Sequence, residues 1–137
     1  MEQKYIKLLS DLCGKLSDKD LDSLSFICER VMEINKKINI TAVDDELGIY
    51  TRHIADSLSL LSVKEFADSS APRVCDIGCG GGFPGLPVKA VKSDIRLTMV
   101  DSTEKKLRTV EETAKLMGLE KISFQPARAE ELARKGE

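Results

Sequence analysis

The sequence has no tryptophan, a single histidine and only 4% aromatic residues in a chain of 137. Its core must therefore be built mainly from leucine, isoleucine and valine. No apolar run approaches the roughly 20 residues of a membrane-spanning helix, and the start of the chain lacks the layout of a signal peptide, so we expect a cytoplasmic protein. The formal net charge of −2 gives no overall basic field that would attract nucleic acid. A local basic face remains compatible with this balance.

The four cysteines follow neither the pattern of a disulfide framework nor that of a zinc site. They are Cys13, Cys28, Cys75 and Cys79. Three residues separate the last two, and no histidine or second cysteine pair accompanies them. We therefore predict free, reduced thiols and no metal site.

The first 63 residues have the periodicity of helices. A helix is expected over residues 2–13, ended near Gly14. The next begins after Ser17, which has Asp20 three residues on in the position of a capping box. Its apolar face is Leu24, Ile27, Val31, Ile34 and Ile38. A further helix is expected from about residue 45, capped by Asp44, with the apolar face Leu47, Tyr50, Ile54, Leu58 and Leu61.

After a charged linker at 64–72, strands and helices alternate. The expected order is a short buried strand Arg73–Ile77, a helix Pro84–Val91, a strand Ile95–Val100, a helix Thr103–Met117 closed by Gly118, a strand Ile122–Phe124 and a charged, helix-like tail Ala129–Glu137. This order predicts the α/β class, with a parallel Rossmann-like sheet that stops after three strands. We therefore divide the chain into an N-terminal helical region, 1–63, and the N-terminal half of a Rossmann-like domain, 73–137.

The most informative segment joins the first strand to the helix after it. Five glycines occur between residues 78 and 85. Glycine allows left-handed backbone conformations and a close approach to a ligand. A loop of this composition between a strand and a helix is typical of a site for a nucleotide-like cofactor.

Two interpretations of this loop compete. Gly80, Gly82 and Gly85 satisfy the G-x-G-x-x-G pattern, and Asp101 follows after about twenty residues, as in nicotinamide dinucleotide sites. That pattern is weak when it stands alone. A purely structural turn, with an aspartate as a helix cap, is the third possibility.

Two residues before the first glycine, Gly78, stands an acid, so the segment also has the pattern Asp76-x-Gly78-x-Gly80-x-Gly82. This spacing is typical of S-adenosylmethionine sites. Asp76 would face the cationic methionine part, and Asp101, at the end of the next strand, would accept hydrogen bonds from the ribose hydroxyls. Both acids would then lie where parallel sheets bind their ligands, at the carboxyl ends of neighbouring strands.

The lone histidine, His53, lies between Arg52 and Asp56 on a predicted helix. These two charged residues are four apart and can pair on one helix face, and His53 can also meet Asp56. Two roles for the histidine stay open. It either belongs to an ordinary helix surface or contact between regions, or it forms an RNA-facing or active-site wall.

Several segments together resemble one enzyme family, the bacterial small-subunit ribosomal RNA guanine-N7 methyltransferases, also called the glucose-inhibited division protein B family. They are Asn39–Ala42, Arg52–Ser57, Asp76–Pro87, Val100–Ser102 with Lys105-Lys106, and Ala127–Glu131. The loop continuation G-G-G-F-P-G-x-P is the most specific of them. Cys79 departs from the serine or threonine usual in the family. Members also continue for several more strands and carry a later arginine at the cofactor.

The resemblance implies methyl transfer from S-adenosylmethionine to N7 of a guanosine in the decoding region of 16S ribosomal RNA, with the small ribosomal subunit as partner. It implies the cofactor positions Gly78, Phe83, Ala129 and Glu130, beside the Asp76, Gly80 and Asp101 already derived. N7 carries a lone pair and no proton, so the reaction needs no general base. We therefore name no catalytic residue.

Two alternatives to this enzyme are a non-catalytic cofactor-binding fragment, because half of the sheet is missing, and a nicotinamide oxidoreductase. The resemblance implies a monomer. A sheet that stops after three strands would, however, leave Arg73–Ile77 as an apolar edge with unpaired backbone groups. We therefore also predict self-association of this short chain through that edge.

Overall fold

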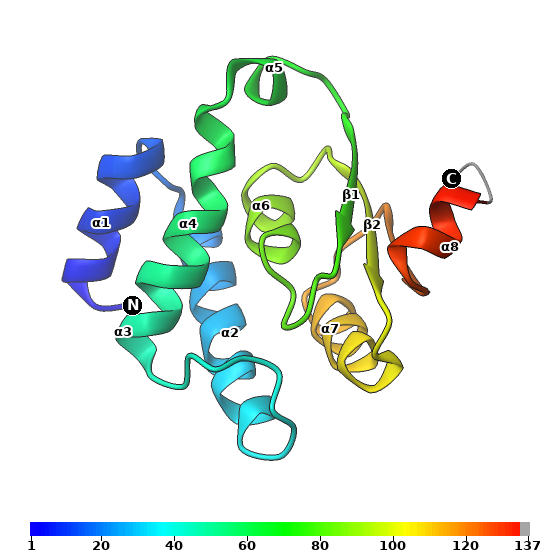
Figure 1. Cartoon of the computed structure of the whole chain (residues 1–137). Coiled ribbons are helices and arrows are strands. Elements are labelled where there is room, and N and C mark those ends of the chain that lie inside the picture. Colours follow the sequence, from blue (N-terminus) through cyan, green and yellow to red (C-terminus); the bar gives the residue numbers. More distant parts are fainter. Residues whose placement is uncertain (135–137) are drawn as a thin grey trace.

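A computed structural model describes residues 1–134 of the chain. Helices fill its N-terminal part, and a small parallel sheet with flanking helices fills the rest (Figure 1). The elements are α1 (Gln3–Cys13), α2 (Asp18–Asn35), α3 (Glu46–Gly48), a π-helix η1 (Ile49–Ile54), α4 (Ala55–Leu58), a 3-10 turn η2 (Ser59–Ser62), α5 (Lys64–Ala67), β1 (Arg73–Ile77), α6 (Gly85–Val91), β2 (Arg96–Asp101), α7 (Glu104–Leu116), β3 (Ile122–Pro126) and α8 (Ala129–Arg134). None of the helices described within 1–134 is long and apolar enough to cross a membrane.

The first two helices begin and end as their sequences predict. Gly14 ends α1 with a φ of 82°, a conformation that glycine adopts without strain. At the start of α2, Ser17 accepts from the backbone N–H of Asp20 and the Asp20 carboxylate accepts from that of Ser17, so the capping box is complete. The helix ends at Asn35, which leaves Ile38 in the loop that follows.

The third helical segment differs from its prediction in two ways. Asp45, one residue later than expected, caps α3 by accepting from Gly48 N at 2.6 Å. The next six residues wind as the π-helix η1, which holds more residues per turn than an α-helix. The apolar face expected from α-helical spacing is therefore broken, and Leu47 is 55% exposed while Tyr50 and Ile54 are buried.

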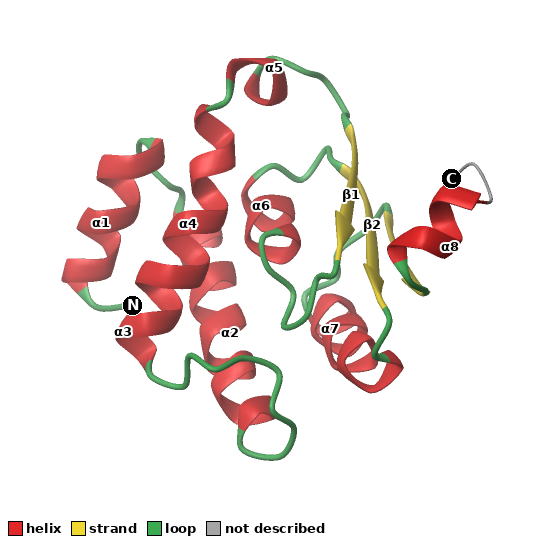
Figure 2. Cartoon of the chain, viewed as in Figure 1, coloured by secondary structure: helices red, strands yellow, loops and turns green. Residues whose placement is uncertain are grey.

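The segment predicted as a linker is partly helical, because α5 occupies Lys64–Ala67. It leads into a three-stranded sheet in the order β1-β2-β3, with both pairs parallel. Helices α6 and α7 lie on one side of the sheet and α8 on the other (Figure 2). The predicted α/β class and strand number are confirmed. The predicted tail helix is α8, and its last predicted residues, 135–137, lie outside the described part.

β1 is an edge strand, and its prediction as a buried strand is wrong. Cys75 is exposed and Ile77 is 54% exposed. A central strand of a parallel sheet is covered on both faces, whereas β1 has one strand neighbour and a partly open face. Its position at the edge agrees with the expectation for a three-stranded sheet, and self-association through it stays a prediction.

A buried lysine closes the end of α6. Lys89 is only 2% exposed, and its ammonium donates to the carbonyl oxygens of Ser93 and Ile95. Burial lowers the pKa of Lys89, and the nearby Lys121 lowers it further. The carbonyls at the end of a helix lack partners within it, so this side chain fixes the turn between α6 and β2.

The helical part and the sheet share one hydrophobic core. Leu24 and Ile27 of α2, Ile54 of η1, and Leu86 and Val88 of α6 belong to the same buried cluster. Helix α6 lies between the N-terminal helices and the sheet (Figure 1) and contacts both α2 and β2. The N-terminal helices are therefore held directly against the segment that follows the glycine loop.

Candidate functional site

Asp101, the last residue of β2, ties together the segments that follow the three strands. One carboxylate oxygen accepts from Gly80 N at 2.9 Å and the other from Thr103 N at 2.8 Å. Its carbonyl oxygen accepts from Ala127 N at 3.1 Å. A carboxylate has about four acceptor positions, so Asp101 can still accept from a ligand while it fixes all three loops.

A cavity of about 470 Å³ opens beside Asp101 at the carboxyl ends of the strands. It is lined by Ile77, Gly78, Asp101, Ser102, Ala127, Arg128, Ala129 and Glu130. The structure thus brings together four of the seven predicted cofactor positions, Gly78 after β1, Asp101 at the end of β2, and Ala129 and Glu130 after β3. Its wall combines an exposed apolar side chain with carboxylates, and its volume falls in the usual range for small-molecule sites.

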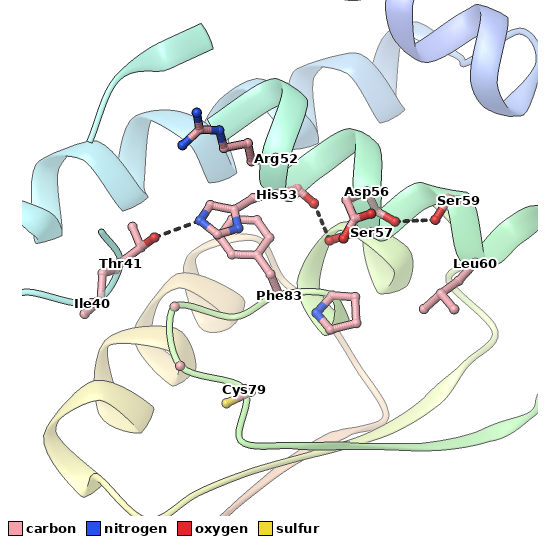
Figure 3. Close-up of a pocket in the computed structure, with 13 residues that line it drawn as sticks. Ile40, Thr41, Arg52, His53, Asp56, Ser57, Ser59, Leu60, Cys79 and Phe83 are labelled. Atoms are coloured by element: carbon pink, nitrogen blue, oxygen red, sulfur yellow. Dashed lines mark hydrogen bonds between the residues drawn. The ribbon is translucent and has the colours of Figure 1, made fainter. Parts of the chain in front are cut away.

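Two more predicted positions, Gly80 and Phe83, line a second cavity of about 490 Å³ on the other side of the glycine loop. Its opposite wall comes from η1, α4 and the loop after α2 (Figure 3). Gly80 has a φ of 51°, a left-handed conformation in which most side chains are strained. The glycine loop lies between the two cavities, because Gly78 lines the first and Gly80 and Gly81 line the second.

The ring of His53 stacks on Phe83, with centroids 4.5 Å apart and planes 9° from parallel. His53 Nε2 lies 2.7 Å from Thr41 Oγ1 (Figure 3). The backbone N–H groups of Ile40 and Thr41 both donate to the side-chain oxygen of Asn35, at the end of α2. The histidine thereby connects the N-terminal helices to the glycine loop.

Asp76, the seventh predicted position, lines neither cavity. Its carboxylate accepts from Gly85 N at 3.0 Å, at the start of α6, and it is 9% exposed. The register pairs Asp76 with Met99, two residues before Asp101. Asp76 therefore lies two residues further than Asp101 from the carboxyl edge of the sheet, and burial raises the pKa of its carboxyl. Cofactor contact by Asp76 stays a prediction, and the hydrogen bond to α6 gives it a structural role.

The glycine loop contains no activated nucleophile. Cys79 is buried, and burial, with smaller contributions from Asp76 and Asp101, raises the pKa of its thiol to about 12. It is therefore protonated at neutral pH and chemically inert. Among the residues described, no group of three histidine, cysteine, aspartate or glutamate side chains could hold a metal ion.

The charged neighbours of His53 do not pair as the sequence suggested. Within residues 1–134, Arg52 and Asp56 form no ion pair with each other, although both line the second cavity. The roles of Asn35 and Thr41 were missed. An asparagine at the end of a helix followed by a short polar segment was the available signal, since such side chains often bind neighbouring backbone groups.

His53 makes the stability of the protein depend on pH. Burial lowers the pKa of His53 below its unfolded value, and Asp56 opposes this only in part. The unfolded chain therefore binds more protons than the folded chain once the pH falls below about 6.5. The free energy of unfolding that the neutral imidazole provides should be fully present above that pH and lost on acidification.

Urea unfolding of the parent and of His53→Gln between pH 5 and pH 7.5 measures this effect. We expect the difference in unfolding free energy between the two proteins to shrink as the pH falls. His53 is the only histidine, and the carboxylates other than Asp56, which interacts with it, contribute alike to both proteins. A difference that is constant across this range would contradict the assignment.

The parallel sheet, the glycine loop after β1 and the acid at the end of β2 define the class of the protein. It is a Rossmann-like α/β protein with a cavity at the carboxyl ends of its strands, where parallel sheets bind their ligands. The family model described as "rRNA small subunit methyltransferase G" (GidB) matches residues 20–137. The chain belongs to this family.

Curated relatives agree with this assignment. The chain is 37% identical over 98% of its length to a ribosomal RNA small subunit methyltransferase G of a Geobacillus species, of which it covers 56%. It is 33% identical over 97% of its length to the protein of that name from Exiguobacterium sibiricum, of which it covers 55%. Over 96% of its length it is 33% identical to the one from Streptococcus gordonii, again covering 55%. The chain thus spans about half the length of these relatives.

Proposed function

We propose that this chain binds S-adenosylmethionine and belongs to an enzyme that methylates N7 of a guanosine in the decoding region of 16S ribosomal RNA. The observation that supports the proposal best is the cavity at Asp101, because its residues suit an adenosine group. Family membership adds the reaction class, ribosomal RNA methylation. The nicotinamide interpretation is less favoured, because the family model that matches residues 20–137 describes a methyltransferase.

The residues beside Asp101 fit the cofactor in chemistry as well as in size. The Asp101 carboxylate has acceptor capacity left for ribose hydroxyls, and the exposed side chain of Ile77 offers an apolar surface to a flat ring. Gly78 has a φ of 73° and no atom within 4 Å of a built Cβ, so a ligand can approach its backbone. We assign Gly78, Asp101, Ala129 and Glu130 to the adenosine part, and Gly80 and Phe83 to the loop beside the reacting end.

When bound, S-adenosylmethionine supplies a methyl group on a positively charged sulfur. N7 of guanine has a free in-plane lone pair and no proton to remove, so no side chain has to act as a base. The task of the protein is to hold the two groups in line and to exclude water. Fixed loops suit this task, and the three hydrogen bonds at Asp101 hold the loops in place before a ligand arrives.

The small ribosomal subunit as partner and a cytoplasmic location are parts of the same proposal. So is a monomeric state of the whole enzyme, beside the self-association predicted for this short chain. So is the division into a helical region, 1–63, and a Rossmann-like region, 73–137. A second candidate is a fragment that binds the cofactor without catalysis. It is favoured by the sheet, which has three strands in residues 1–134 where doubly wound folds commonly have about six.

One pair of measurements separates these candidates. Calorimetry with S-adenosylhomocysteine, the stable product, tests cofactor binding, and transfer of labelled methyl groups to purified small subunits tests catalysis. Binding with transfer supports the enzyme, and binding without transfer supports the fragment. Absence of binding by a chain that melts cooperatively would refute both.

A further inference from the structure

The second cavity has features that cofactor binding at Asp101 does not use. It lies between the glycine loop on one side and η1 and α4 on the other. Its volume of about 490 Å³ is ample for one nucleobase. Cys79, Gly80 and Gly81 line it, so a molecule in this cavity would lie next to the loop that borders the proposed cofactor site.

One wall of this cavity is an aromatic pair. His53 and Phe83 are stacked, and both rings are half-buried, so part of the pair faces the cavity. The hydrogen bond between Thr41 Oγ1 and His53 Nε2 restrains the orientation of the imidazole (Figure 3). Fixed aromatic and histidine rings are the surfaces on which proteins stack single nucleobases taken out of an RNA strand.

The rim of the cavity carries one acidic and one basic side chain, which do not pair with each other. Asp56 and Arg52 both line it and both are exposed, and no ion pair joins them in the described part of the chain. A carboxylate accepts two parallel hydrogen bonds and a guanidinium donates two. These are complementary to the Watson–Crick edge of guanine, which has donors at N1 and N2 and an acceptor at O6.

We propose that this cavity receives the acceptor base and selects guanine, with Asp56 accepting from N1–H and N2–H₂ and Arg52 donating to O6. The base stacks on the His53–Phe83 pair, and its N7 stays free of protein donors. Adenine carries an acceptor at N1 and a donor at N6, the reverse pattern, so it would leave both charged side chains unpaired. This inference rests on the proposed function and names the residues that determine its base specificity.

The amino-acid end of the cofactor is the competing occupant, because it carries both an ammonium and a carboxylate. Equilibrium binding distinguishes the two. Guanosine, inosine and adenosine monophosphates are titrated into the chain by NMR, with and without saturating S-adenosylhomocysteine. The parent should bind the guanine nucleotide about ten-fold more tightly than the adenine nucleotide. Inosine monophosphate, which lacks the N2 amino group, should lie between them.

Asp56→Asn is the decisive variant. Its side chain has one acceptor oxygen and one donor NH₂ group, so it cannot accept from N1–H and N2–H₂ with two oxygens. It should raise the dissociation constant for the guanine nucleotide about ten-fold and reduce its preference over the adenine nucleotide to less than about two-fold. Its affinity for S-adenosylhomocysteine should stay within about two-fold of the parent's. Asp44→Asn, an exposed acid outside the cavity, should change neither quantity.

Two results would overturn the proposal. One is a parent that fails to distinguish guanine from adenine nucleotides. The other is an Asp56→Asn protein that keeps its base preference but loses affinity for S-adenosylhomocysteine, which would give the cavity to the cofactor. Failure of the proposed function looks different, because the parent would then not bind S-adenosylhomocysteine at all. Melting curves of each variant confirm that binding is compared between folded proteins.

Discussion

Replacing Asp101 by alanine should weaken binding of S-adenosylhomocysteine about 100-fold, or close to 3 kcal/mol. The substitution removes the acceptors for Gly80 N and Thr103 N, so the loops after β1 and β2 lose their common anchor. It also removes the acceptor proposed for the ribose hydroxyls. Hydrogen bonds to charged groups contribute about 1.5–3 kcal/mol each, which accounts for the size of the effect. Calorimetry measures it directly.

A matched control is available just before the same strand. Asp94, before the start of β2, accepts from Ala71 N at 2.8 Å and lies away from both cavities. Asp94→Ala should cost some stability and leave the affinity unchanged. Asp101→Asn keeps one acceptor oxygen and should lose about ten-fold, which guards against a folding defect in the alanine variant. Equal affinities for the parent and both Asp101 variants would remove Asp101 from the site.

Replacing Gly85 by alanine should lower the free energy of unfolding by about 2 kcal/mol, and the melting temperature by about 8 °C. A Cβ at this position would lie 2.7 Å from Met99 Cε, 2.9 Å from Asp76 Oδ2 and 3.3 Å from Leu97 Cδ2. Met99 is fully buried, so either its terminal methyl group rearranges within the core or helix α6 shifts away from the sheet. A shift of α6 would also lengthen the hydrogen bond from Gly85 N to Asp76.

Gly81→Ala serves as the control for this experiment. A Cβ there would meet Ile40 O at 3.5 Å and no atom closer, an ordinary contact. The change should cost less than about 1 kcal/mol. Thermal unfolding of the two variants side by side distinguishes local crowding under α6 from a general intolerance of side chains in the loop. A Gly85→Ala protein as stable as Gly81→Ala would contradict the packing argument.

Local rules predicted the parts of the fold that depend on neighbouring residues. The capping box of Ser17 and Asp20 and the glycine end of α1 are confirmed, since both need only a few adjacent residues. The alternation of strands and helices after residue 72 is confirmed to within one or two residues at each end. The edge position of β1 was predicted, but the exposure of the Cys75 and Ile77 side chains was not, because the sequence does not show which face of the strand its neighbours cover.

The π-helix η1 shows where periodicity fails. Apolar spacing assumes 3.6 residues per turn, and the wider turn at Ile49–Ile54 rotates the residues on either side of it relative to that pattern. Leu47 consequently faces solvent although it fits the stripe. No residue in the segment signals such a turn, and the turn places Tyr50 and Ile54 in the core.

The sequence predicted which strand ends form the candidate site, but it did not predict the contacts between the residues of the site. Glycines and acids after strands predicted that Gly78 and Asp101 lie together, and the family resemblance added Ala129. All three line one cavity, because the ends of parallel strands meet at one edge. The depth of Asp76 depends on the register of β1 against β2, which the sequence does not reveal. The stacking of His53 on Phe83 joins segments thirty residues apart and depends on the tertiary fold.

The second cavity has walls from two parts of the chain, the helices before residue 63 and the loop after β1. A ligand can fill it only when those parts are both folded and in contact. Its binding free energy therefore adds to the free energy that holds them together. Thermodynamic linkage thus makes the occupant a stabiliser of the whole molecule, and saturation with it should sharpen unfolding into a single cooperative transition.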